Sequence, residues 1–241
     1  MRAWVSGLKW LVFLLILSGL GWMANHYIPG QHLPWKALDA SRPLGSATKS
    51  QLLRLSLSPS KTCMTLARDI SNFQSIPADP KAAPQSGLGK DICGWDVARV
   101  VYGQNKTLLS PGEANMQCPL SVATYLWIRE IDNIAKERYG EGLAKIHHLG
   151  SYSCRKQNGN GSNRWSEHAF ANAWDVSGFE LTDGHLVTVL AHWDMVDRDA
   201  AFLRDIRQAA CKLFRVTLSP DYNAAHRDHF HVDMGPSAAC R

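Results

Sequence analysis

Two short segments of the sequence concentrate side chains that could do chemistry. Residues 166–175 read Ser-Glu-His-Ala-Phe-Ala-Asn-Ala-Trp-Asp, and residues 226–233 read His-Arg-Asp-His-Phe-His-Val-Asp. Histidine and carboxylate groups are the usual protein ligands of a catalytic zinc ion, which keeps a fourth position for water. Three histidines within six residues, flanked by two aspartates, therefore indicate a metal or catalytic site.

The spacing within the first segment sets a condition on the local structure. His168 and Asp175 are seven residues apart. On one helix they would lie about 10 Å apart along the axis, and on one straight strand an odd offset would place them on opposite faces. They can share an ion only if the chain turns between them. We expect that bend at residues 171–172, with Asp175 opening a strand.

The second segment is predicted to be a strand on which His229, His231 and Asp233 share one face. Asp228 can join them only from the turn just before that strand. Motifs of several other chemistries are absent from the sequence, namely His-Glu-x-x-His, Gly-x-Ser-x-Gly, a P-loop and a dinucleotide fingerprint.

The elements that must position these segments follow from turn residues and the hydrophobic pattern. Pro119 stands at a first helical position, and apolar residues recur at three-and-four spacing until Gly140. Asp183 and Gly184 join two β-rich runs, as in a hairpin. The predicted elements are a helix over 118–140, a hairpin over 174–190, a helix over 199–214 and strands at 216–218 and 229–234. Helices and strands are segregated along the chain, so the predicted class is α+β, an antiparallel sheet with segregated helices.

The N-terminal residues predict export. An uncharged apolar stretch follows Arg2 and Lys9, and residues 4–24 suffice as a helix to cross a hydrocarbon layer about 30 Å thick. The one candidate cleavage site would place Trp22 where a signal peptide needs a small residue. We therefore favour a retained membrane anchor over residues 1–27, with a cleaved signal peptide as the alternative. The flanking charges predict a single pass through the cytoplasmic (inner) membrane, with the C-terminal domain in the periplasm or cell envelope.

Beyond the anchor, the composition predicts a tether and one folded domain. Residues 28–60 contain four prolines with several serines and glycines, whereas residues 61–241 contain no internal repeat. The 26 basic residues outnumber the 21 acidic ones, but they form no basic run. This pattern argues against nucleic acid as a partner.

The cysteines are typical of an exported, disulfide-stapled domain. Their number is even, and no two have the close spacing of a zinc knuckle or a redox Cys-x-x-Cys pair. Six cysteines permit fifteen connectivities, and element order suggests only that Cys63 pairs with Cys93. The cysteines are Cys63, Cys93, Cys118, Cys154, Cys211 and Cys240.

Residues 150–155, 166–179 and 226–233 resemble the bacterial extensin-like C-terminal domain, and the resemblance covers about residues 60–241. That family is in turn similar to zinc D-alanyl-D-alanine peptidases and L-alanyl-D-glutamate endopeptidases of the Hedgehog/DD-peptidase superfamily. Their pattern is Ser-x-His-x-x-Gly-x-Ala-x-Asp, followed later by an acidic residue, two others and His. Ala171 stands where that pattern has glycine, and Asp228 where many carboxypeptidases have glutamate.

The resemblance implies a DD-peptidase-like fold and a role for each matching residue. It implies one zinc ion per chain, bound by His168, Asp175 and His231. Asp228 is then the general base, and Arg155 stabilises an oxyanion or holds a substrate carboxylate. The resemblance also implies that His229 and Ser166 lie next to the ligands without binding the metal, and that His229 orients a ligand or the substrate.

Together these features predict a zinc-dependent hydrolase acting on peptidoglycan stem peptides, as a carboxypeptidase or an endopeptidase. One alternative is a non-catalytic cell-wall-binding module that keeps zinc for stability. Another is a peptidase acting on other envelope peptides or proteins. Asp228 and Arg155 favour the enzyme, because a purely structural zinc site closes its fourth position and needs neither.

Overall fold

The computed structural model describes residues 2–57, 63, 65–66, 70, 73–77, 93–94, 97–101, 107–157 and 162–241. The chain divides into two compact units, Met1–Gln51 and Leu52–Arg241, and each is described by itself. The predicted boundary between tether and domain, at residues 60–61, lies outside the described residues.

The N-terminal unit begins with a long exposed helix, α1 (Arg2–Tyr27). Within it, Gly7–Tyr27 is long and apolar enough to cross a membrane. This length and composition agree with the membrane span predicted at residues 4–24. Its exposed large apolar side chains include Trp10, Phe13, Leu14, Leu15 and Trp22.

The segment after α1, predicted to be a tether, has local structure of its own. It contains the 3-10 helix η1 (Gly30–His32) and leads into α2 (Thr48–Leu57). The side-chain amide of Gln51 donates to Gly30 O and Leu33 O, both at 2.9 Å. These bonds fold the segment back on itself.

Within the described residues, the C-terminal unit contains two sheets. The larger has seven strands in the order β10-β8-β9-β6-β5-β3, with β7 paired to β6. Its strands are β3 (Leu108–Ser110), β5 (Leu143–Gly150), β6 (Ala173–Leu181), β7 (Leu186–Thr188), β8 (Val216–Leu218), β9 (Phe230–Asp233) and β10 (Ala239–Cys240). The smaller sheet is antiparallel and contains β1 (Phe73–Pro77), β2 (Val97–Val101) and β4 (Ala114–Gln117). Its helices include α4 (Cys118–Tyr139), α5 (Val189–His192) and α6 (Arg198–Cys211).

This mixed architecture of helices and sheets agrees with the predicted class in outline, but the large sheet is not wholly antiparallel. β3 runs parallel to β5, and β10 runs parallel to β8. The antiparallel prediction is therefore wrong at both ends of the sheet. At one end the chain travels through β4 and α4 between β3 and β5, and such a crossover allows parallel pairing.

The turns that rest on proline and glycine are confirmed, but the hairpin ends at Thr188, two residues before its predicted end, because α5 begins there. α4 has proline in its first turn and ends at Gly140, which adopts the left-handed conformation with φ 78°. β6 and β7 pair antiparallel across a turn in which Gly184 has φ 88°. α6 ends at Cys211, three residues before the predicted end, because a tighter turn follows in which Leu213 N donates to Ala210 O at 2.9 Å.

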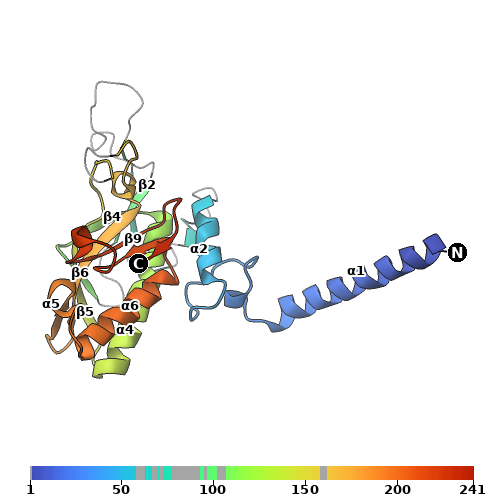
Figure 1. Cartoon of the computed structure of the whole chain (residues 1–241), viewed down its shortest axis with the longest axis horizontal. Helices are drawn as coiled ribbons and strands as arrows, with labels where there is room; N and C mark the ends of the chain where they lie inside the picture. Colours follow the sequence, from blue (N-terminus) through green and yellow to red (C-terminus); the bar gives the residue numbers. More distant parts are fainter. Residues whose placement is uncertain are drawn as a thin grey trace. The chain divides into compact units, whose positions relative to one another are not determined.

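Trp127 of α4 is the centre of the core. Its ring makes edge-on contacts with Trp174 and Phe179 of β6 and with Phe214. Its indole Nε1 donates to Ile206 O of α6 at 2.9 Å. α4 and α6 thus lie side by side against the large sheet (Figure 1).

All six cysteines are paired, as predicted, but the suggested Cys63–Cys93 pair is wrong. The disulfides are Cys63–Cys118, Cys93–Cys154 and Cys211–Cys240. Pairing follows proximity in the fold, which brings Cys63 to the start of α4, and element order in the sequence does not report that proximity.

We expect Trp127→Ala to lower the free energy of unfolding by about 3–5 kcal/mol, because it empties the centre of the core. Trp127→Phe should cost less, about 1–3 kcal/mol, since it removes the hydrogen bond from Nε1 to Ile206 O and part of the buried ring. Urea unfolding with the disulfides intact measures both. The exposed Trp35 is the control, and equal losses for Trp35→Ala and Trp127→Ala would contradict the placement.

Candidate metal centre

The pairing of β6 with β9 brings two of the predicted ligands together. Asp175 lies directly opposite His231 in the antiparallel register. Side chains alternate between the two faces of each strand, so the neighbours Trp174, Phe230 and Val232 are buried in the core. Asp175 and His231 therefore project from the opposite face of the sheet.

His168 reaches them from a short turn before β6. It lies on the 3-10 helix η3 (Glu167–Phe170), whose first turn is capped by Ser166 Oγ, which accepts from His168 N at 3.3 Å. Ala171 then adopts the left-handed conformation with φ 52°, and the chain turns into β6. The bend predicted at residues 171–172 is confirmed.

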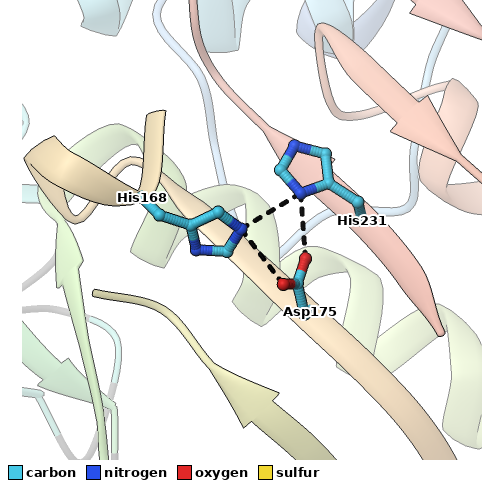
Figure 2. A group of neighbouring side chains, drawn as sticks. All are labelled: His168, Asp175 and His231. Atoms are coloured by element: carbon cyan, nitrogen blue, oxygen red, sulfur yellow. Dashed lines mark hydrogen bonds and ion pairs between the residues drawn. The ribbon is translucent and has the colours of Figure 1, made fainter. Parts of the chain in front are cut away.

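The three side chains point toward a common centre (Figure 2). His168 Nε2 lies 3.1 Å from Asp175 Oδ2 and 3.2 Å from His231 Nδ1, and His231 Nδ1 lies 2.9 Å from Asp175 Oδ1. Ligand atoms bound tetrahedrally to zinc at about 2.0–2.1 Å are separated by about 3.3 Å. Among the residues that the structure describes, this is the one group of three such side chains close enough to hold an ion.

In His168 and His231, the hydrogen bond of the outward-facing ring nitrogen determines whether the inward-facing nitrogen carries a proton. His168 Nδ1 is 3.2 Å from Ser151 O, which can only accept, so that nitrogen carries the proton. His231 Nε2 is 3.0 Å from Asp233 Oδ2 and donates to it. In neutral imidazoles the remaining nitrogens then present lone pairs, beside the carboxylate of Asp175. Three acceptors then converge, an arrangement that a proton or a cation between them would stabilise.

The pKa shifts of His231 and Asp175 also indicate that positive charge is favoured at this site. Burial would lower the pKa of His231, but its hydrogen bonds with Asp175 and Asp233 raise that pKa to about 9. Burial would raise the pKa of Asp175, but bonds from His168 and His231 hold it well below its usual range. Without a metal, a proton on His231 supplies the cation.

The predicted base, Asp228, lies outside this triangle. Its side chain is 45% exposed, and its Oδ1 accepts from His229 Nδ1 at 2.8 Å. The other ring nitrogen of His229, Nε2, lies 3.8 Å from Asp175 Oδ1. His229 therefore stands between Asp228 and the centre.

Arg155 is exposed next to the same turn, where its carbonyl oxygen accepts from Ser166 N at 3.1 Å. Its charge also acts on His226, whose ring lies 5.2 Å from that of His229. Burial is the main cause that lowers the pKa of His226 to about 4, and the nearby His229, His231 and Arg155 lower it further. The backbone of Arg155 is thus bonded to the turn that carries His168, and its charge acts on His226.

Sequence reasoning missed the two groups that orient the imidazoles. The alternation pattern placed Asp233 on the correct face of the strand, but it did not predict that Asp233 would bond His231. The signal was its i+2 position, which on one strand face places a carboxylate beside the ring. Ser151 O is a backbone atom 17 residues from His168, and no residue pattern reports such a contact.

Comparison with known families places this geometry in context. Residues 62–241 match the family model described as Extensin-like protein C-terminus. The chain belongs to this extensin-like C-terminal family. The matched segment of the extensin-like chain includes every residue of the candidate centre. No match was found among curated proteins or among solved structures.

We expect the left-handed residue of the extensin-like turn to tolerate glycine but not valine. Ala171→Gly removes a backbone cost of about 1–2 kcal/mol but loses a buried methyl worth about 0.8 kcal/mol and loosens the unfolded chain, so stability should change by less than about 1 kcal/mol. Ala171→Val should cost more than about 2 kcal/mol, since a β-branched residue disfavours positive φ and overfills a buried site. Urea unfolding of the two variants tests this, and equal tolerance would contradict the assigned conformation.

Proposed function

We propose that this protein is a zinc-dependent hydrolase acting on peptidoglycan stem peptides. The observation that carries the proposal is the convergence of two imidazole nitrogens and one carboxylate, each 2.9–3.2 Å from the next. Imidazole and carboxylate are donors that suit zinc, and three protein ligands leave a position for water or substrate.

His168, Asp175 and His231 would hold the ion, and Ser151 O and Asp233 would keep their donor atoms aimed at it. When bound, zinc supplies Lewis acidity, which polarises a carbonyl group and makes water more acidic. Both imidazoles keep their outward N–H bonds, so the ligand atoms need no rearrangement to accept the ion.

Proton transfer falls to the Asp228–His229 pair. His229 Nε2 is the atom of this pair that faces the centre, and Asp228 accepts from the opposite ring nitrogen. The carboxylate would orient the ring and stabilise its charged form while His229 Nε2 takes the proton from water. Asp228 thus contributes to base catalysis through His229.

Arg155 would bind the negative charge of the substrate. The residue is exposed, its charge acts on His226, and its backbone is bonded to the turn that carries His168. A guanidinium matches a carboxylate with two parallel hydrogen bonds. Stem peptides carry carboxylates, and the net charge of +5 also favours an anionic polymer.

The choice of peptidoglycan is supported by the resemblance of residues 166–175 and 226–233 to zinc peptidases that cut stem peptides, and by the apolar N-terminal helix. A helix of that length suits a protein held at the cytoplasmic membrane with its domain in the envelope. The alternative, a zinc-stabilised wall-binding module, gives no role to the Asp228–His229 pair.

We expect the full chain, purified in detergent, to contain about one zinc ion per molecule, as a site with three protein ligands should. His231→Ala should lose the metal. His147→Ala on β5 is the matched control, because this histidine bonds Glu180 on the same sheet and should leave zinc content unchanged. Elemental analysis measures both, and metal-free wild-type protein with its three disulfides formed would refute the centre.

We expect the full chain to release muropeptides from purified sacculi. Asp228→Asn and His229→Gln should each slow release by about 10²- to 10⁴-fold while sparing zinc. The double variant should lose little more than either single variant, since residues that act as one unit are not additive. Arg155→Lys should also slow release, because an ammonium makes no forked contact. Mass spectrometry of released fragments gives the rates.

The exposed Asp194 provides the control, and Asp194→Asn should leave the rate unchanged. Sacculus binding without any fragment release by zinc-loaded wild-type protein would favour the binding module over the hydrolase. Loss of zinc in Asp228→Asn would instead place that residue among the ligands.

A further inference from the structure

The turn that carries His168 is held from outside by a set of hydrogen bonds that we call the turn clamp. Four consecutive carbonyl oxygens, those of residues 168 to 171, each accept from another part of the chain. The donors are Ser153 N to His168 O at 3.1 Å, Gly94 N to Ala169 O at 2.8 Å, Gln117 Nε2 to Phe170 O at 2.7 Å and Gln117 N to Ala171 O at 2.8 Å.

Every donor of the turn clamp is the immediate neighbour of a cysteine. Ser153 precedes Cys154, Gly94 follows Cys93 and Gln117 precedes Cys118. The first two donors are joined to each other by the Cys93–Cys154 disulfide, and Cys118 is joined to Cys63. The third disulfide, Cys211–Cys240, links α6 to β10 and contributes no donor.

The turn depends on this support because it has little stability of its own. η3 has four residues, and helices this short do not persist without tertiary contacts. It also ends in a left-handed alanine. Asp175 and His231, by contrast, are fixed by the sheet. His168 is therefore the ligand whose position depends on the clamp.

The two disulfides of the clamp differ in accessibility. Cys63, Cys118 and Cys93 are buried, whereas Cys154 is exposed. Thiol–disulfide exchange begins with attack on an accessible sulfur. Of the two, Cys93–Cys154 is the one that presents an exposed residue to a reductant.

We propose that the Cys93–Cys154 disulfide is a redox control of the metal centre: its reduction releases the His168 turn and lowers zinc affinity. The inference rests on the proposed function, because it takes zinc as the ligand. The reductant is a dithiol, which gives up two electrons and two protons and closes its own disulfide. Cys93 and Cys154 each become a thiol, and Ser153 N and Gly94 N are no longer held together against the turn.

Variants in which both cysteines of one disulfide are replaced test the proposal in the full chain in detergent. They open the disulfide without a thiol reductant, which would itself bind zinc. Zinc affinity is measured by competition with a chromogenic chelator in Cys93→Ser/Cys154→Ser and, as the matched control, in Cys211→Ser/Cys240→Ser. Loss of an outer support of a metal ligand typically weakens metal binding 10- to 100-fold. We expect a loss of at least about 10-fold in the first variant and no measurable loss in the control.

A second variant tests the clamp with all disulfides intact. Gln117→Ala removes the bond to Phe170 O and should weaken zinc binding by less than the cysteine pair does. The exposed Gln208 of α6 supplies the control, Gln208→Ala. Hydrogen exchange at the amides of Ala171 and Asn172, which are bonded within the turn, gives a reading that needs no zinc. Exchange should be faster in Cys93→Ser/Cys154→Ser than in the control pair.

The proposal would be overturned if Cys93→Ser/Cys154→Ser bound zinc as tightly as Cys211→Ser/Cys240→Ser, whether or not both bind it more weakly than the wild type. Unchanged exchange at Ala171 and Asn172 in Cys93→Ser/Cys154→Ser would overturn it as well, whatever the zinc result. Wild-type protein that binds no zinc would refute the proposed function and with it the redox control of metal binding, while faster exchange would still show that the disulfide holds the turn.

Discussion

The register between β6 and β9 is the constraint on which the rest of the domain depends. It places Asp175 opposite His231 on one face and, because side chains alternate, Trp174 and Val232 in the core on the other. One set of backbone hydrogen bonds therefore fixes both the packing and the site. A slip by one residue would bury the polar pair and expose the aromatic core, which makes this register strongly specified.

The third candidate ligand comes from a different kind of structure. His168 lies on a turn outside the sheet, and its geometry is set by a cap, a left-handed residue and bonds from distant segments. The candidate centre thus combines two side chains on a rigid pair of strands with one on a supported turn. The outward bonds of the two imidazoles, to Ser151 O and Asp233, complete the arrangement by choosing which nitrogen faces inward.

The features that the sequence predicted are those set by local chemistry. Proline and Gly140 delimit α4, Asp183 and Gly184 make the hairpin turn, and the offset of His168 from Asp175 requires the bend that Ala171 supplies. What escaped prediction depends on contacts between distant segments. The parallel strands at the two ends of the sheet and the disulfide partners are of this kind.

The same distinction holds within the candidate site. Residue types and spacing were enough to indicate a metal site in the two segments, and the resemblance to zinc peptidases selected His168, Asp175 and His231, which the structure brings together. Neither the pattern nor the resemblance was enough to place His229 between Asp228 and the centre, because two adjacent side chains of a turn can exchange such positions without any change in spacing. Gln117 and Gly94 act through backbone and amide groups, which carry no chemical signature in a sequence.

The interleaved order of two disulfides has a consequence for how the domain matures. Cys63 pairs across Cys93 to Cys118, and Cys93 pairs across Cys118 to Cys154. During synthesis from the N-terminus, Cys63 and Cys93 are both made before either of their native partners. Oxidation in the order of emergence would join these two, and reshuffling takes roughly minutes to hours without a catalyst. Rapid correct maturation therefore requires either oxidation that occurs only after residue 154 is available or an isomerase that corrects the first pair.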